Sequence, residues 1–158
     1  MIQSQWMKKI IRIVILVLFC LYCAFFIIGS SLAPIFAHFG LYEPSAILTS
    51  PLMYSCHQQP TRSFWFLGYP VAICCRCYGF YLGVCITTIF AIFNKLNIKL
   101  KTLLILIMLC ITDITINCLF STNTGNYTRF IIGILMGLIF VRLLCYIFEI
   151  RKGEKNEK

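Results

Sequence analysis

The stretch IVILVLFCLYCAFFIIGSSL, residues 13–32, decides how this chain folds. It is twenty residues long and carries no charge, and an α-helix of that length crosses the roughly 30 Å hydrocarbon core of a bilayer. A cleaved signal peptide is the alternative, because Lys8, Lys9 and Arg12 precede the run, but signal peptides have a shorter apolar region. We therefore expect a retained membrane-spanning helix.

The composition of the whole chain points the same way. Of its 158 residues, 60% are hydrophobic and only 12% are charged. A soluble domain of this size could not bury so much apolar surface. The composition therefore excludes soluble enzymes, coiled coils, disordered tails and free nucleic-acid-binding domains, and it predicts a polytopic membrane protein.

Three further apolar runs have the length of a membrane span. They cover residues 71–93, 102–120 and 130–150. Short separators, 94–101 and 121–129, suit antiparallel neighbours in a bundle. We therefore predict an all-α fold, a single membrane domain over residues 1–158 with four transmembrane helices and one long connection, 33–70.

The positions of lysine and arginine predict an orientation, because translocated loops are depleted in them. Ten of the fourteen basic residues fall on one side of the predicted bundle: Lys8, Lys9, Arg12, Lys95, Lys99, Lys101, Arg151, Lys152, Lys155 and Lys158. Both termini, with the tail 151–158, are thus expected in the cytoplasm, and the loop 33–70 outside the plasma or inner membrane. Topology explains the net charge of +9, so no nucleic-acid partner is expected.

The predicted outer loop is itself apolar. Its only charges are Glu43 and Arg62, and residues 64–67 read Phe-Trp-Phe-Leu. Tryptophan and tyrosine favour the headgroup level of a membrane. We expect the loop to lie along the outer interface as a lid, broken into short pieces by Pro44, Pro51, Pro60 and Pro70.

Most of the ten cysteines fall inside apolar runs, where a thiol behaves as a small hydrophobic side chain. This group comprises Cys20, Cys23, Cys85, Cys110, Cys118 and Cys145. The pair Cys20 and Cys23 has CxxC spacing but lies in the middle of the first span, without polar neighbours. We therefore interpret all six as packing residues.

Two other cysteine motifs fall at the predicted outer boundary of the membrane. Cys56 is followed by His57, and Cys74 is separated from Cys77 by two residues, a spacing that can turn two sulfurs toward one ion. Cys56, His57, Cys74 and Cys77 would supply the Cys3His set that suits tetrahedral zinc. His57 could instead support a ligand, with Cys75 or water completing the site. Arg62 and Arg76 would offset the thiolate charge.

The same thiols allow two other interpretations. Cys74 and Cys77 could form and transfer a disulfide, with Cys56 as the exchanging partner. Alternatively, Cys56 could form a structural disulfide with Cys74 or Cys77 that staples the loop to the bundle. The cysteine spacing alone leaves all three open.

Charges inside predicted spans form a second feature, because such charges are expensive and mark function or an internal pair. Arg76 lies ~8 Å and Asp113 ~10 Å below the outer ends of their spans, at the helical rise per residue. We expect these two residues to pair inside the bundle, with Asn117 one turn from Asp113 as a hydrogen-bonding neighbour.

Glycine pairs mark close helix contacts. Gly79 and Gly83 in the second span, and Gly133 and Gly137 in the fourth, each form a GxxxG motif. Either motif could mediate an oligomer. Arg129 begins the second of these stripes and is expected near the outer rim, beside the cysteines.

Together these residues resemble a family of small bacterial membrane proteins known as DUF2085, whose function is unknown. The resemblance rests on C-H-Q at 56–58, R-S at 62–63, Gly68, C-C-R-C at 74–77, and the glycines and tyrosine that follow at 79, 81 and 83. Asp113, Arg129, Gly133 and Gly137 are similar to its later elements, although Ile114 and Ile132 depart from its pattern. The resemblance implies that Cys56, His57, Arg62, Cys74, Arg76, Cys77 and Asp113 act as one site.

The leading hypothesis is thus an integral membrane protein with an outward-facing Cys/His site for a transition metal, with zinc as the favoured ion. A binding or structural site is favoured over a catalytic one, because only Glu43 and Asp113 could supply an acidic base outside the cytoplasmic end. Whether the chain is an enzyme is left undecided. A membrane thiol-disulfide oxidoreductase is the second hypothesis, and a small transporter or structural protein is the third.

Overall fold

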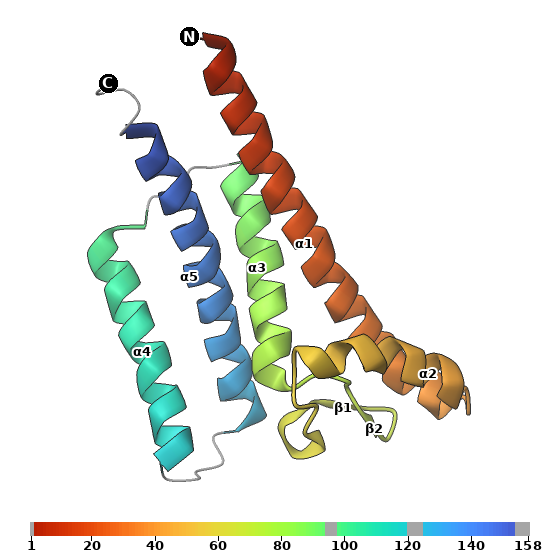
Figure 1. The fold of residues 1–158 in the computed structure, drawn as a ribbon. Helices are drawn as coiled ribbons and strands as arrows, with labels where there is room; N and C mark the ends of the chain where they lie inside the picture. Colours follow the sequence, from red (N-terminus) through yellow and green to blue (C-terminus); the bar gives the residue numbers. More distant parts are fainter. Residues whose placement is uncertain (1, 94–97, 120–124, 154–158) are drawn as a thin grey trace.

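The computed structural model describes residues 2–93, 98–119 and 125–153, and it is mostly helical (Figure 1). The helices are α1 (Ile2–His38), α2 (Tyr42–Thr49), α3 (Cys75–Phe93), α4 (Leu100–Leu119) and α5 (Asn126–Gly153), with the short 3-10 helices η1 (Ser50–Tyr54) and η2 (Pro60–Arg62) and the strands β1 (Trp65–Phe66) and β2 (Tyr69–Pro70). Within the predicted all-α fold, the short hairpin β1–β2 was not anticipated.

Three helices in the described residues are long and apolar enough to cross a membrane. They cover Ile10–His38, Cys75–Phe93 and Asn126–Ile147. Their apolar side chains include many that are exposed, as expected of surfaces that face lipid. The fourth predicted span falls on α4, a 20-residue helix, and remains a prediction. The predicted boundary residues 94–97 and 120–124 and the end of the tail, 154–158, lie outside the described residues.

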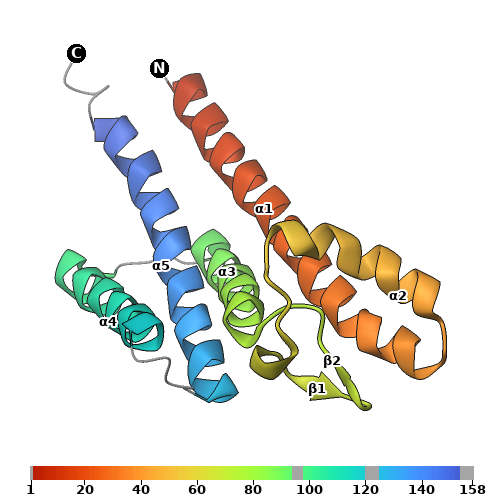
Figure 2. The ribbon, with the colours of Figure 1, turned by 60° about the horizontal axis from the view of Figure 1, so that its bottom comes forward.

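The long helices form a row rather than a closed square. Helix α3 packs between α5 and α1, and α4 packs on α5 (Figures 1 and 2). The described ends of α1 and α5 nearest the chain termini lie together, and the hairpin lies at the opposite end of the row. We call these the terminal end and the hairpin end.

Glycine makes the contact between α3 and α5 close. A Cβ atom added at Gly79 would overlap the backbone of Phe130, and one added at Gly133 would overlap the backbone of Arg76. Gly83 and Gly137 meet the opposite helix in the same way. The two GxxxG motifs therefore face each other within one chain.

Helix α1 packs on α3 through an apolar cluster that also contains thiols. Phe26 of α1 lies against Tyr81 of α3, with ring centroids 5.1 Å apart. Nearer the hairpin end, the hydroxyls of Ser31 and Tyr78 are hydrogen bonded at 3.0 Å. These contacts fix the register of α1 against the first turns of α3.

The connection between α1 and α3 is more ordered than its prolines suggest. Helix α1 continues through Pro34 to His38, beyond the predicted end of the first span. Helix α2 then packs along α1, where Ser45 Oγ donates a hydrogen bond to the carbonyl of Ala33 at 2.9 Å. Helix α2 thus lies beside α1, and the role of the loop as a lid stays a prediction.

The hairpin β1–β2 projects apolar side chains from the hairpin end. Its turn residues Leu67 and Gly68 both have positive φ, 53° and 82°, as in a two-residue type I′ turn. Trp65, Phe66 and Leu67 are exposed. Phe64, just before the hairpin, instead contacts Phe130 of α5 with a centroid distance of 5.6 Å, and this contact anchors the segment to the bundle.

Candidate metal centre

Three thiols meet at the hairpin end of the bundle, where α3 begins. The sulfurs of Cys56, Cys74 and Cys77 all lie within 4.8 Å of one another, and those of Cys74 and Cys77 are 3.3 Å apart. Cys56 is buried, and the other two are half-buried. This group could hold a metal ion, and we call it the outer thiol group after the side of the membrane on which the sequence predicts it.

The local backbone explains why residues so distant in sequence converge. Cys56 follows η1, and its amide donates to the carbonyl of Leu52 at 3.0 Å. Cys74 lies at the start of α3, where its carbonyl accepts the first helical hydrogen bond, from Tyr78. The Cys74 amide donates to the Cys56 sulfur at 3.2 Å, so that sulfur sits against the N-terminus of α3.

Two further hydrogen bonds hold the approach to α3. The amide of Ala72 donates to the carbonyl of Ser30 on α1 at 3.3 Å, and that of Val71 to the carbonyl of Phe64 at 2.8 Å. On the other arm, the Gln58 side chain donates to the carbonyl of Thr49 at 2.9 Å. The backbone is therefore tied down on both sides of the outer thiol group.

The electrostatics of the group favour one thiolate. Hydrogen bonds from the thiols of Cys74 and Cys77 lower the pKa of Cys56 well below that of an ordinary cysteine. The same contact with Cys56 raises the pKa of Cys74. An amide at a helix N-terminus adds to the stabilisation of negative charge on Cys56. The charge that attracts a cation is therefore concentrated on the sulfur from the loop.

Two candidate ligands from the sequence lie apart from these sulfurs. The side chain of His57 is exposed and does not belong to the group of atoms within 4.8 Å. Cys75 is fully buried and also lies outside that group. The role of His57 as a ligand stays a prediction.

The arginine and aspartate of the spans form a second polar group. Arg76 Nη2 donates to Asp113 Oδ2 at 2.5 Å, and Asn117 Nδ2 donates to Asp113 Oδ1 at 3.0 Å. Arg76 is thus directed toward α4 and paired with Asp113, as the depths of the two residues in their spans predicted, and its effect on the thiolate charge stays a prediction. Arg62 is exposed at the surface. The residues expected to act as one site are therefore divided between two groups.

Arg129 lies near this second group at the start of α5. It is 5% exposed and interacts electrostatically with Arg62, Arg76 and Asp113. It lies in the first turn of α5 and also interacts electrostatically with the thiol of Cys75. Sequence spacing did not separate the face of α3 that carries Arg76 from the face that carries Cys77.

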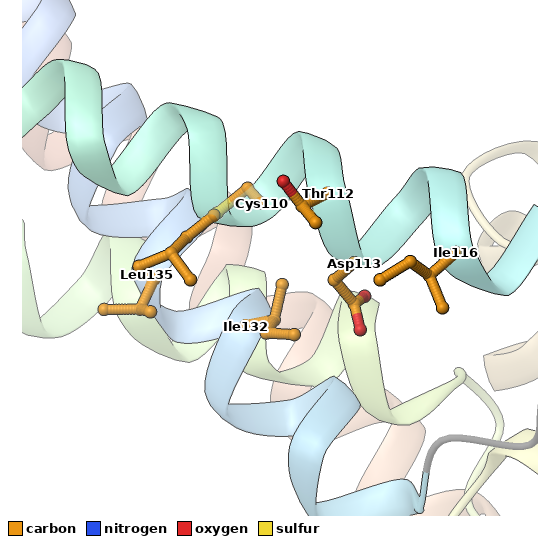
Figure 3. Close-up of a pocket in the computed structure, with 7 residues that line it drawn as sticks. Cys110, Thr112, Asp113, Ile116, Ile132 and Leu135 are labelled. Atoms are coloured by element: carbon orange, nitrogen blue, oxygen red, sulfur yellow. The ribbon is translucent and has the colours of Figure 1, made fainter.

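A cavity of about 250 Å³ opens beside Asp113, between α4 and α5 (Figure 3). Apart from Asp113 and Thr112, its lining is apolar or thiol, and comprises Leu109, Cys110, Ile116, Ile132 and Leu135. The Thr112 hydroxyl donates to the carbonyl of Met108 at 2.8 Å. The cavity thus offers few polar groups to a ligand.

Apolar helices and a thiol group competent for metal binding define a helical membrane protein with a candidate soft-metal centre. Residues 56–143 match the family described as "Predicted membrane protein (DUF2085)". This match covers more than half of the chain, which therefore belongs to the DUF2085 family.

Two relatives extend the comparison. An uncharacterized protein of Methanocaldococcus jannaschii is 32% identical over 152 residues, which are 90% of this chain and 94% of the relative. An uncharacterized protein of Methanothermobacter thermautotrophicus is 30% identical over 88 residues, 54% of this chain and 79% of the relative. Both relatives are archaeal. No solved structure matches the chain.

Proposed function

We propose that this protein is a multi-pass membrane protein that binds zinc through Cys56, Cys74 and Cys77 on the outer side of the membrane. The observation that carries the proposal is the mutual spacing of the three sulfurs, all within 4.8 Å. A tetrahedral zinc ion with Zn–S bonds of about 2.3 Å separates its sulfurs by about 3.8 Å. The thiols therefore need only small side-chain shifts to coordinate one ion.

His57 or a water molecule supplies the fourth ligand. His57 is adjacent to Cys56 and exposed, so rotation of its side chain is sterically free on the solvent side. Three thiolates and one neutral ligand give a zinc complex with one net negative charge. The N-terminus of α3 offsets that charge, since helix N-termini favour anions.

The outward position rests on the distribution of basic residues. The outer thiol group lies at the start of α3, and that end of α3 is at the hairpin end of the row (Figure 1). Most lysines and arginines of the sequence are expected at the opposite, terminal end. In this arrangement both termini are cytoplasmic, α4 is the fourth span, and the exposed hairpin lies in the outer interface.

The site binds its ion for structure or capture rather than for catalysis. Within the described residues, the metal-competent group contains no carboxylate, and the side chain of Asp113 is engaged by Arg76 and Asn117. A hydrolytic zinc enzyme needs a general base beside the metal-bound water. We therefore expect stoichiometric zinc without hydrolytic activity.

Metal analysis of the detergent-purified full chain tests this proposal. Wild type should carry one zinc per chain, and Cys74→Ser should lose it. Cys75→Ala is the matched control, because that thiol is adjacent in sequence but lies outside the outer thiol group, and it should keep the metal. A wild-type protein free of metal after zinc loading, or equal loss in Cys75→Ala, would refute zinc binding at these sulfurs.

A membrane thiol-disulfide oxidoreductase is the second candidate, favoured by the 3.3 Å separation of the Cys74 and Cys77 sulfurs. Oxidation of the two thiols would form one S–S bond and release two protons and two electrons to a partner disulfide or a quinone. A metal-free protein with a reducible bond between these cysteines would favour it. A small transporter that uses the Arg76 and Asp113 pair ranks third.

A further inference from the structure

A second set of thiols lies deeper in the same bundle, between α1 and α3. The Cys85 thiol donates to the carbonyl of Cys20 at 3.5 Å and interacts with the thiols of Cys20 and Cys23. Cys23 is fully buried. We infer that Cys20 and Cys85, with Cys23 beside them, form a second metal site that takes a soft monovalent cation such as Cu(I).

This site lies near the middle of both helices. Cys20 is the central residue of α1, which spans residues 2–38, and Cys85 is one residue from the centre of α3, which spans 75–93. In the proposed topology both are therefore deep in the hydrocarbon core. There the described neighbours are mainly apolar side chains, so sulfur is the main ligand offered to an ion.

The helical phase aligns this site with the outer thiol group. Cys77, Tyr81 and Cys85 are four residues apart and follow one face of α3, about 6 Å per step and ~12 Å in all. Tyr81 interacts electrostatically with Cys77, one turn nearer the hairpin end, and with Cys23 on α1. Thiols of both sets also belong to one core cluster. The two thiol groups therefore lie along one face of α3.

Charge selects the class of ion. Binding one monovalent cation between Cys85 and Cys20 replaces one thiol proton, forms a metal–sulfur bond to that thiolate and uses the second thiol as a neutral ligand. The net charge stays unchanged, whereas added charge in the hydrocarbon core is expensive. Soft thiol ligands select Cu(I). Zinc would require four ligands, and only the outer group has three ligand atoms within 4.8 Å in the described chain.

Packing alone explains these thiols less well than it explains Cys110. Cys110 is a single buried thiol in a separate cluster with Leu103 and Ile139. The three thiols at the α1–α3 interface come from two helices and interact with one another. Cys110 therefore serves as the matched control, because none of the described thiols is among the residues that interact with it.

Titration with Cu(I), delivered under anaerobic conditions from a coloured chelator, tests this inference without involving the outer site. The triple variant Cys56→Ser/Cys74→Ser/Cys77→Ser should still bind one Cu(I) per chain. Adding Cys20→Ala and Cys85→Ala should abolish that binding, whereas adding Cys110→Ala should not. No Cu(I) bound to the triple variant, or binding that survives loss of Cys20 and Cys85, would overturn the second site.

Alkylation of the wild-type chain provides a measurement that does not depend on variant folding. A membrane-permeant maleimide, followed by peptide mass spectrometry, should label Cys20 and Cys85 several-fold less when Cu(I) is bound, with Cys110 unchanged. Equal labelling with and without Cu(I) would overturn the inference. Zinc content of the wild type is measured separately, so failure here and failure of the outer zinc site are distinguishable.

Discussion

Replacing Gly133 with alanine tests whether the contact between α3 and α5 determines the stability of the bundle. The new Cβ would overlap the carbonyl of Arg76 and lie 2.9 Å from the amide nitrogen of Phe80. Both obstacles are backbone atoms, which cannot rotate away as a side chain does. Overpacking costs about 1–3 kcal/mol, and we assign the upper value here because two backbone contacts are violated at once.

Alanine also favours a helix over glycine by about 1 kcal/mol, so the net destabilisation is about 2 kcal/mol. That change lowers the ratio of folded to unfolded protein about thirty-fold. The assay is unfolding of the purified variant in a fixed detergent, followed by circular dichroism. Gly29→Ala is the control, because the nearest atom to its added Cβ is Leu48 Cδ2 at 4.0 Å, and it should be neutral or stabilising. A Gly133→Ala protein as stable as wild type would refute the close-contact argument.

Three further predictions concern the charges, the thiolate and the hairpin. Asp113→Asn leaves Arg76 without its counter-charge and should destabilise the protein by about 3 kcal/mol, measured by unfolding in detergent. This is the lower end of the cost of breaking a buried ion pair, because the Arg76 side chain is 27% exposed. Unchanged stability would contradict the pair. Since hydrogen bonds lower the pKa of Cys56, the metal-free protein should keep its thiolate ultraviolet absorbance as pH falls below the ordinary titration range of a thiol. In Cys74→Ala, which removes one of these hydrogen bonds, the absorbance should be lost at a higher pH. Identical pH profiles for the two proteins would contradict the role of that hydrogen bond. With the other tryptophan of the chain replaced by phenylalanine, Trp65 fluorescence should be quenched by brominated lipids in vesicles, and an unquenched signal would remove the hairpin from the interface.

The sequence pattern was sufficient to predict features that depend on the length of one helix and on the depth of a residue within it. Apolar runs near twenty residues predict helices of membrane length because every backbone group is satisfied within the helix. The depth of Arg76 and Asp113 below their span ends also indicated a contact between helices. In both cases the inference needed only the rise per residue and the cost of an unpaired charge.

The sequence did not predict which helix packs against each face of another helix. The GxxxG motifs of residues 79–83 and 133–137 indicate close approach but do not say whether the approaching helix belongs to the same chain. The structure pairs them with each other. Likewise Arg76 and Cys77 are adjacent, yet one helix step of about 100° separates their directions, and this step divides the polar residues into two groups.

The thiols at the α1–α3 interface illustrate a different limit. Cys20 and Cys23 had no polar neighbour along the chain, so their spacing carried no weight. Their relevant neighbour, Cys85, is 65 residues from Cys20 in sequence and meets it only after α1 packs on α3. The hairpin was missed for a related reason, because a two-residue turn after one short apolar run is a weak signal until its two strands are seen to pair.

The 18-residue separation between Cys56 and Cys74 has a mechanical consequence. One ion shared by both would close a loop that contains the hairpin, much as a covalent bridge does, and closing a loop of about 15 residues is worth roughly 3 kcal/mol in the chain-entropy model. Only the segment between the first two long helices benefits, because the close α3–α5 contact needs no ion. The resistance of that segment to proteases should therefore increase with the fraction of chains that hold a metal ion, while the helices remain folded in either state.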